Sequence, residues 1–267
     1  MPDPSSTSLR PTGPSVQVAL QDHRGPLTLD VSFTLAAGWS VLFGPSGSGK
    51  STILRLIAGL DQPRAGRVVF LPETPGSVPR TLTDTVRNLH VGPEHRRVRL
   101  LSQRPALFPH LSVLGNLNFA TRHQPAHSRS AASPRADTTR LDRIVALCGI
   151  APLLGRKPSA LSGGERQRVA LARTLLAKPI DLLLLDEPFT GLGAGPRDTL
   201  IHDLRAWLAP HATPVLLVTH DLGEVFASGG NVMRLEGGRI QASGPAETVL
   251  APERAAMLQR MRASEGS

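Results

Sequence analysis

A glycine-rich segment near position 50 constrains the fold of this chain more than any other part of its sequence. Residues 44–52 read GPSGSGKST and fit the pattern G-x-x-x-x-G-K-[ST]. In loops of this kind backbone N–H groups surround phosphates, a lysine reaches the β- and γ-phosphates, and a hydroxyl contacts Mg²⁺. The segment therefore predicts a phosphate-binding loop formed by Gly44, Pro45, Ser46, Gly47, Ser48, Gly49, Lys50, Ser51 and Thr52.

The residues on both sides of this loop predict the strand and the helix that such a loop requires. Residues 27–35 alternate apolar and polar side chains, and residues 39–43 run directly into the loop, so both segments are expected to be strands. After the loop, apolar residues recur at helical spacing from Ile53 to Leu60, and the helix is expected to end near Gly59. A helix that begins at the loop presents unpaired N–H groups and the positive end of its dipole to an anion.

A later strand-like run ends in two adjacent carboxylates. Residues 180–187 read IDLLLLDE, and four consecutive leucines are typical of a strand buried on both faces. Open α/β sheets bind ligands at the carboxyl ends of such strands. We expect Asp186 to bind Mg²⁺ through water, with Ser51 supplying a direct hydroxyl, and Glu187 to act as a general base toward water. The alternative, that an acidic pair before Pro188 only ends a strand, is disfavoured by the phosphate loop upstream.

A serine and two glycines precede a helical run in the middle of the chain. Ser162, Gly163 and Gly164 stand directly before residues 165–176, so a hydroxyl and bare N–H groups again point out of an expected helix N-terminus. A capping turn would need only the serine, whereas the paired glycines indicate close approach of the backbone to a phosphate. Because the phosphates held by residues 44–51 already have a site, we expect a two-fold dimer in which each copy's turn faces the other copy's loop.

Composition and charge narrow the class of protein. The chain has 267 residues, 40% of them hydrophobic, and no apolar run approaches the roughly 18 residues of a membrane span. A soluble protein is therefore expected, and because residues 1–14 lack the apolar region of a secretory signal, nothing indicates secretion. Its one cysteine, Cys148, cannot form an internal disulfide and suits a reducing cytoplasm.

The formal net charge of +9 comes almost entirely from arginine. We interpret the arginines as a solvated surface, and attraction for nucleic acid or anionic lipid is the alternative. No aromatic residues interleave with them as a stacking platform for bases requires, so no nucleic-acid partner is expected.

Five motifs in a fixed order make the chain similar to the ATP-binding subunits of ABC transporters, over roughly residues 16–250. GPSGSGKST matches the Walker A loop, Gln103 within LLSQRPALFPHLSVLGNL matches the Q-loop, and LSGGERQRVALARTLL matches the family signature. LLLLDEP matches the Walker B segment, and His220 in VLLVTHD matches the switch histidine. The resemblance implies an α/β fold: a P-loop NTPase core with an antiparallel β subdomain and a helical signature subdomain.

The expected domain boundaries follow from this fold and from segments that show no regular helix or strand pattern. Residues 103–178 have a helical pattern and are expected to form the helical subdomain, inserted in the core. Residues 72–81 read as a turn-rich loop, and residues 121–137 read as a polar linker. The expected units are a disordered tail over 1–14, the ABC ATPase domain over 15–252, and a C-terminal tail over 253–267.

The resemblance also implies a role for each matched residue. Lys50 would neutralise charge on the β- and γ-phosphates of ATP. Glu187 would act as the base, and His220 would hydrogen-bond the γ-phosphate and position the attacking water. Beside loop 44–52, the residues expected to bind ATP are Gln103, Ser162, Gly163 and Gly164, and those expected around Mg²⁺ are Ser51, Gln103 and Asp186.

The partners implied by the resemblance place the chain on a membrane. Two ATP molecules would lie at the interface of a homodimer on the cytoplasmic face of the cell membrane. Hydrolysis of this ATP would drive transmembrane permease subunits. A periplasmic or extracellular solute-binding protein would act indirectly. The Gln103 segment moves with the γ-phosphate in this family, so residues 105–113 are the expected docking surface. Phe108 and Leu111 could equally be ordinary packing residues.

Within the family, the stretches around Gln103 and the signature are most similar to importer ATPases for oxyanions, especially molybdate. An ATPase subunit does not touch the cargo, so no residue here selects the solute. Two departures stand out. Members of this group usually carry a C-terminal regulatory β domain, whereas this chain stops soon after Leu250. In addition, Gly193 occupies the position after Walker B where the family usually has an aspartate.

Two other classes of function compete with transport. An ABC-type ATPase that acts on nucleic acid would be expected to carry a zinc cluster, long heptads or tandem cassettes, and the sequence shows none of these. A nucleotide-gated module that binds without hydrolysis is disfavoured by Glu187 and His220, although Gly193 leaves room for it.

Overall fold

The structure is a computed structural model and describes residues 13–73, 76–122 and 134–265. The predicted N-terminal tail and the predicted linker 121–137 therefore lie largely outside the described residues.

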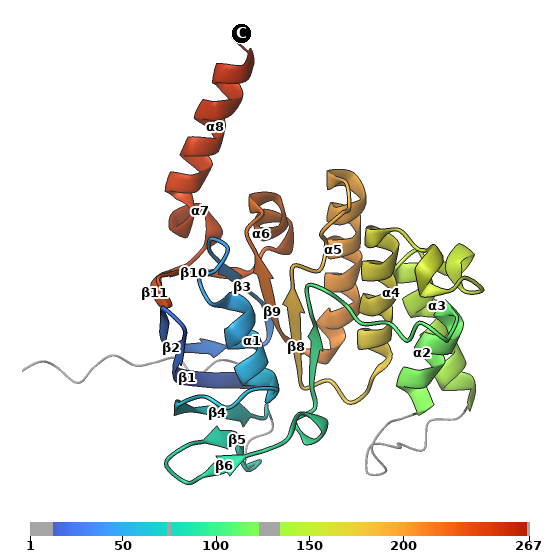
Figure 1. The fold of residues 1–267 in the computed structure, drawn as a ribbon, viewed down its shortest axis with the longest axis horizontal. Coiled ribbons are helices and arrows are strands. Elements are labelled where there is room, and N and C mark those ends of the chain that lie inside the picture. Colours follow the sequence, from blue (N-terminus) through green and yellow to red (C-terminus); the bar gives the residue numbers. More distant parts are fainter. Residues whose placement is uncertain (1–12, 74–75, 123–133, 266–267) are drawn as a thin grey trace, which may run out of the picture.

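Two β-sheets organise the described chain (Figure 1). The first is antiparallel and contains β1 (Ser15–Arg24), β2 (Leu27–Leu35), β4 (Ala65–Leu71), β5 (Arg80–Asp84) and β6 (Leu89–His90), in the order β2-β1-β4-β5-β6. The second contains β3 (Gly38–Phe43), β7 (Val98–Leu101), β8 (Leu182–Asp186), β9 (Pro214–Thr219), β10 (Asn231–Glu236) and β11 (Arg239–Gly244). Its order is β11-β10-β3-β9-β8-β7, and all neighbours pair in parallel except β10 and β11.

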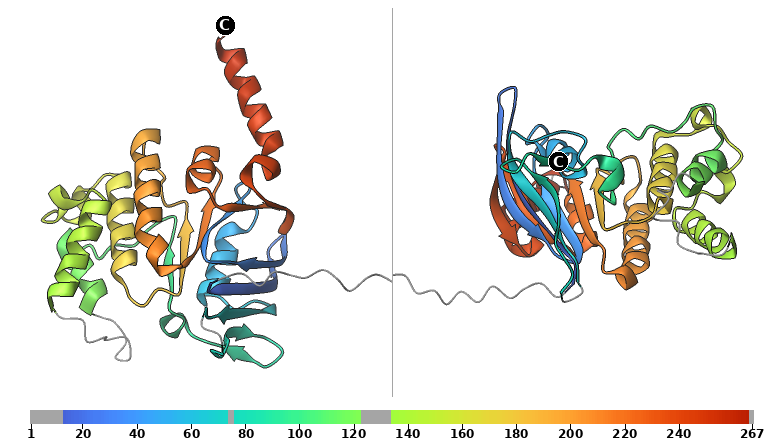
Figure 2. Two further views of the ribbon diagram at one scale, coloured as in Figure 1. Left: turned by 180° about the vertical axis from the view of Figure 1, so that it is seen from behind. Right: turned by 90° about the horizontal axis from the view of Figure 1, so that it is seen from below.

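Helices pack against the second sheet, and further helices lie to one side of it, as Figures 1 and 2 show. Helix α4 contacts α2 and α3, and these three helices form a separate group beyond α5. All three lie between residues 103 and 178, where the sequence predicts helices. The helices are α1 (Lys50–Ala58), α2 (Val113–Arg122), α3 (Pro134–Leu147), α4 (Gly163–Leu176), α5 (Ala194–Leu208), α6 (Leu222–Ser228), α7 (Ala246–Val249) and α8 (Ala251–Glu265), with short 3₁₀ helices at Pro93–His95, Ala151–Leu153, Pro158–Ala160 and Ala209–His211.

Helix α1 is buried between the two sheets. Its apolar side chains, such as Ile53 and Leu56, share one core cluster with Val18 of β1 and Leu184 of β8. A second cluster joins the opposite face of the parallel sheet to α4 and α5. Burial on both faces explains why β8 and β9 are continuous apolar runs in the sequence.

The parallel sheet brings the predicted site segments to one edge. β3 pairs with β9, and β9 pairs with β8, all in parallel, so their carboxyl ends lie side by side. The glycine loop follows β3, Asp186 ends β8, and His220 follows β9. Ligands of open α/β sheets bind at this edge.

The fold class and the strand-loop-helix order agree with the sequence, and three boundaries differ. β5 begins at Arg80, inside the predicted loop 72–81, and α3 begins at Pro134, inside the predicted linker. The predicted C-terminal tail is instead helix α8, which extends away from the body (Figure 2). Its residues have high helix propensity but form no apolar stripe, so a search for periodicity misses it.

A buried arginine fixes the C-terminal end of α1 to the antiparallel sheet. Arg96 is fully buried and donates hydrogen bonds to the Ile57 carbonyl (2.8 Å) and to Thr83 Oγ1 (2.8 Å). Burial lowers its pKa to about 10, so the side chain is still cationic at neutral pH. A cation beside the carbonyls that end a helix is favourable, and it compensates part of the cost of burying the charge.

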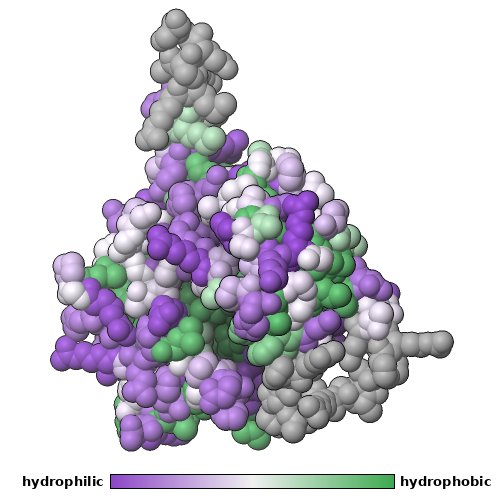
Figure 3. All heavy atoms as spheres, turned by 45° about the vertical axis from the view of Figure 1, so that its right-hand side comes forward, coloured by the Kyte–Doolittle hydropathy of each residue, from purple (hydrophilic) through white to green (hydrophobic). Residues whose placement is uncertain are grey.

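The surface is mixed in character. On the face drawn in Figure 3, apolar residues are scattered among polar ones, and some line a hollow near its centre. Among the residues that the structure describes, no helix is both long enough and apolar enough to cross a membrane.

The one cysteine is expected to be unreactive in the folded protein. Cys148 is 1% exposed, and burial raises the pKa of its thiol to about 12, so the reactive thiolate is scarce at pH 8. Titration with a thiol-reactive dye should therefore detect no rapid modification in native buffer and one thiol per chain in denaturant. Rapid labelling of the native protein would contradict the buried placement.

Candidate functional site

The glycine loop is held tightly between neighbouring strands. A Cβ atom at Gly44 would clash with the carbonyl oxygen of Leu235 on β10, so only glycine fits there. Gly49 precedes α1 with φ 101°, a conformation that other residues rarely adopt. The loop between these glycines is exposed from Pro45 to Gly47, and no side chain caps α1. Backbone N–H groups at this helix end are therefore available to a phosphate.

Two buried side chains of the loop are poised to bind an anion. Lys50 is 6% exposed, and its Nζ donates to the carbonyls of Gly44 (2.7 Å) and Pro45 (2.8 Å), which leaves one ammonium N–H. Burial lowers the pKa of Lys50, against the effect of the nearby Glu187 charge. Ser48 Oγ is buried without a hydrogen-bond partner among the described residues. An orphaned hydroxyl and an ammonium in one loop fit a phosphate ligand.

The three expected Mg²⁺ ligands line one cavity. Asp186 ends β8 and lines the same cavity as Ser51, the first residue after the loop's lysine, whose hydroxyl lowers the pKa of the Asp186 carboxyl. These two residues and Gln103 face a cavity of about 600 Å³. Burial raises the pKa of Asp186, and the charge of Glu187 adds to the effect. Hydroxyl, amide and carboxylate oxygens are the donors that Mg²⁺ prefers, so these residues fit the ion.

The candidate base is held between two motifs that are far apart in the sequence. Glu187 Oε2 accepts a hydrogen bond from Gln103 Nε2 at 2.7 Å, and Oε1 lies 3.0 Å from His220 Nδ1. An ionised carboxylate only accepts, so His220 donates from Nδ1. The structure thus brings together three residues predicted for one site. It also shows Gln103 bonded through its nitrogen to the base, which leaves its amide oxygen for a metal ion.

The peptide of Glu187 is unusual. Its φ is 47°, a left-handed conformation that is uncommon outside glycine. Its N–H donates to the Val218 carbonyl (2.9 Å), and its carbonyl accepts from Thr190 Oγ1 (3.1 Å) and Gln167 Nε2 (3.4 Å). The backbone that orients the base is therefore anchored on both sides.

The signature turn caps its own helix and lies apart from the phosphate loop. Ser162 Oγ accepts from Glu165 N (3.2 Å), while Glu165 Oε2 accepts from Ser162 N (2.7 Å), which forms a reciprocal cap. Ser162 and Gly163 are exposed, and neither they nor Gly164 line the cavity of Asp186. Binding of the turn at residues 162–164 to a phosphate held by a second copy stays a prediction.

Two neighbours of the site were not singled out by the sequence analysis. Gln167 is buried at a helical position where an apolar residue is expected. This polar residue in an apolar position is the sequence feature that could have identified it. Arg197 of α5 bonds the carboxylate of Asp221 (3.0 Å), which caps α6 directly after His220. Gly193, the departure noted above, precedes α5 and supplies no side-chain cap.

The predicted docking segment 105–113 is only partly available. Phe108 is half-buried, its N–H donates to Asn116 Oδ1 (2.8 Å), and the guanidinium of Arg173 lies over its ring. Leu111 is also half-buried. Exposed residues of the segment are Ala106, Pro109 and His110. Phe108 therefore packs against α2 and α4.

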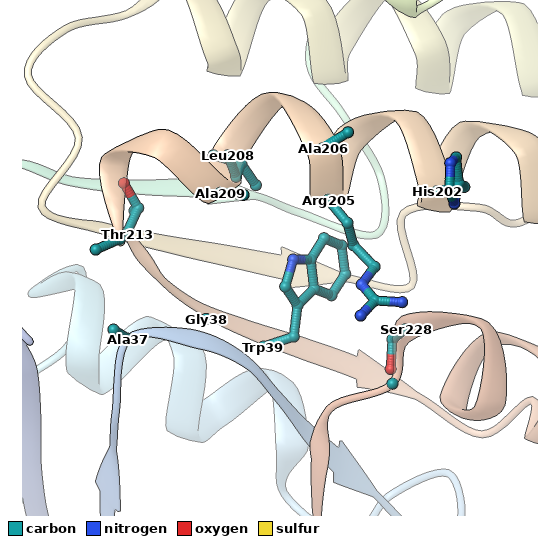
Figure 4. Close-up of a pocket in the computed structure, with 12 residues that line it drawn as sticks. Ala37, Gly38, Trp39, His202, Arg205, Ala206, Leu208, Ala209, Thr213 and Ser228 are labelled. Atoms are coloured by element: carbon teal, nitrogen blue, oxygen red, sulfur yellow. The ribbon is translucent and has the colours of Figure 1, made fainter. Parts of the chain in front are cut away.

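Another cavity of about 600 Å³ lies at the opposite ends of the strands (Figure 4). It is lined by Trp39 at the start of β3, by Arg205 and Leu208 of α5, and by Thr213 before β9. It contains none of the residues predicted for the site.

Replacing Asp186 by asparagine is expected to raise the melting temperature of the nucleotide-free protein by a few degrees. A carboxyl whose pKa is raised by folding costs stability at neutral pH, because its charged form is disfavoured in the folded state. That cost is present above the folded pKa and disappears as pH falls below the unfolded value of about 4. Calorimetry at pH 7 and pH 4 should show a difference that shrinks in acid. A lower melting temperature for Asp186→Asn at pH 7 would contradict this account.

Comparison with known proteins gives consistent matches. A family profile described as ABC transporter matches residues 28–190. The Molybdenum import ATP-binding protein ModC of Mesorhizobium japonicum is 38% identical over 236 residues, 88% of this chain and 60% of that protein. The protein of the same name from Mycobacterium tuberculosis is 43% identical over 228 residues, 85% of this chain and 59% of that protein. The chain thus spans about 60% of the length of these relatives.

Solved structures support the fold. A bacterial Atm1-family ABC exporter with ATP bound superposes with a TM-score of 0.70 at 24% identity, covering 98% of this chain and 44% of that chain. A dimeric bacterial ABC transporter cassette gives a TM-score of 0.68 at 24% identity, covering 86% and 98%. At this identity the likeness concerns the fold alone.

Proposed function

The chain belongs to the ABC transporter family, and on this premise we propose that it is the ATP-hydrolysing, energy-coupling subunit of an importer for an oxyanion such as molybdate. One observation carries the proposal. Glu187 is held between Gln103 and His220, and it directly follows Asp186, which lines one cavity with Ser51 of the phosphate loop. Phosphate binding, metal binding and water activation thus share one edge of the sheet.

The substrate is Mg·ATP. Lys50, the orphaned Ser48 hydroxyl and the free N–H groups of loop 44–52 bind its phosphates. Ser51, Gln103 and Asp186 would hold Mg²⁺, which would neutralise phosphate charge. Compact charge-assisted hydrogen bonds of this kind are stronger than neutral ones.

Hydrolysis requires a base beside the γ-phosphate. Glu187 accepts a proton from water as the water oxygen bonds to the γ-phosphorus, and the bond to the β-γ bridging oxygen breaks to give ADP and phosphate. His220 donates from Nδ1 to Glu187 in the nucleotide-free state, so its neutral form has no second N–H for the phosphate. His220 therefore binds the γ-phosphate either after leaving Glu187 or as the imidazolium.

The assembly has several parts. A second copy of the chain forms a homodimer, in which Ser162, Gly163 and Gly164 bind the partner's ATP. Permease subunits dock near the exposed Pro109 and His110 and place the dimer on the cytoplasmic face of the membrane. A periplasmic or extracellular solute-binding protein delivers the cargo. The relatives named for molybdenum import favour this role over the nucleic-acid and non-hydrolysing alternatives.

The test first identifies the permease that co-purifies with the chain. The two are then co-expressed, and ATP hydrolysis by their complex is measured in liposomes. Binding protein loaded with molybdate should stimulate turnover several-fold, and sulfate-loaded protein serves as the matched control. Hydrolysis stimulated only by sulfate would reassign the cargo. A folded complex without any ATP hydrolysis would refute the energy-coupling role.

A further inference from the structure

Helix α4 carries a buried amide that contacts the backbone of the candidate base. Gln167 is 4% exposed and lies five residues after Ser162 on the helix that the signature turn caps. Its Nε2 donates to the Glu187 carbonyl at 3.4 Å. A buried amide needs hydrogen-bond partners, and this one uses the peptide of the residue that activates water.

That peptide needs support. A non-glycine residue at φ 47° is strained and persists only when its surroundings hold it. Thr190 belongs to the same loop as Glu187, so its hydrogen bond moves with the loop. Gln167 is the donor from outside that loop, and it belongs to the helical group of α2, α3 and α4.

The same helix touches the loop at a second point. A Cβ atom at Gly164 would lie 3.0 Å from the Gly191 carbonyl oxygen, so the first turn of α4 approaches the backbone that follows Glu187. One rigid helix therefore contacts residues 187 and 191 of the loop.

We propose that Gln167 is a positioning residue for Glu187 and couples the two ATP sites of the dimer. The inference rests on the proposed function, in which the signature turn of one copy binds the other copy's ATP. Binding there seats α4, and Gln167 then holds the Glu187 peptide in the conformation that aims the carboxylate. Each copy thereby hydrolyses its own ATP fully only when the second site is also filled.

The test uses the complex with its permease and three variants. Gln167→Met keeps the length of the side chain without a donor, and Gln167→Leu is a second apolar replacement without a donor. Thr174→Val is the matched control, because Thr174 is on α4 and its hydroxyl donates to the Ala170 carbonyl of the same helix. The readouts are kcat, KM for ATP, the Hill coefficient for ATP and the melting temperature.

Both Gln167 variants are expected to lower kcat by about 10- to 100-fold, because a small misplacement of the base is sufficient. KM should stay within about threefold, and the Hill coefficient should fall toward 1. If Gln167→Met does not fold, Gln167→Leu decides. A folded variant with the wild-type kcat and Hill coefficient overturns the positioning role of Gln167. A fall in kcat that is fully explained by a smaller fraction of folded protein also overturns it. An inactive wild-type complex would overturn this inference together with the proposed function, whereas unaffected variants in an active complex overturn this inference alone.

Discussion

Replacing Glu187 by glutamine is expected to lower the rate of ATP hydrolysis by about 10²- to 10⁴-fold while ATP binding is retained. The amide has the size of the carboxylate and still offers one oxygen to the N–H of His220, which lies 3.0 Å from the carboxylate in the structure. It cannot take a proton from water. Because the substitution removes a negative charge that would face the γ-phosphate in the proposed complex, the ATP-bound dimer should also become more stable.

Two measurements separate these effects. Phosphate release in a single turnover reports the chemical step, and ATP-dependent dimerisation in gel filtration reports binding. Glu94→Gln is the matched control, because it removes the same charge from a highly exposed position outside the site. Turnover of Glu187→Gln at the wild-type rate would remove Glu187 from the role of base.

The parts of the site that the sequence predicts are the parts formed by local order. Loop 44–52 is contiguous, and the strand and helix that position it have strong patterns of their own, so β3 and α1 were expected at their observed places. Asp186 likewise follows from a run of leucines that ends in a carboxylate. In such cases one continuous segment contains both the structural and the chemical signal.

The contacts around Glu187 could not be predicted in this way. Gln103 is 84 positions away from Glu187 in the sequence, and the hydrogen bond between them depends on how β7 and β8 align. Gln167 bonds a backbone carbonyl, which no residue pattern identifies. The helix at 251–265 was read as a tail because it has helix propensity without an apolar stripe. Tertiary packing determines the two hydrogen bonds, whereas α8 reflects helix propensity alone.

Replacing Lys50 by alanine is expected to weaken ATP binding by about 10- to 100-fold, which corresponds to one lost hydrogen bond to a charged group, about 1.5–3 kcal/mol. In the nucleotide-free protein Lys50 Nζ is already bonded to the carbonyls of Gly44 and Pro45. The ammonium is therefore held inside the loop before ATP arrives, and little ordering is required on binding. Titration of ATP by calorimetry measures the effect, with Lys157→Ala, an exposed lysine outside the site, as the control.

The same substitution distinguishes a binding role from a structural one. Burial lowers the pKa of Lys50, so the charged lysine costs stability at neutral pH, and its removal relieves that cost while two hydrogen bonds are lost. These terms oppose each other, and we expect the melting temperature of nucleotide-free Lys50→Ala to stay within a few degrees of wild type. Lys50→Arg should also bind ATP weakly, because a forked guanidinium does not replace a compact ammonium between two carbonyls. Unchanged ATP affinity in Lys50→Ala would contradict the phosphate-binding role. A large fall in melting temperature would instead show that Lys50 mainly holds the loop together.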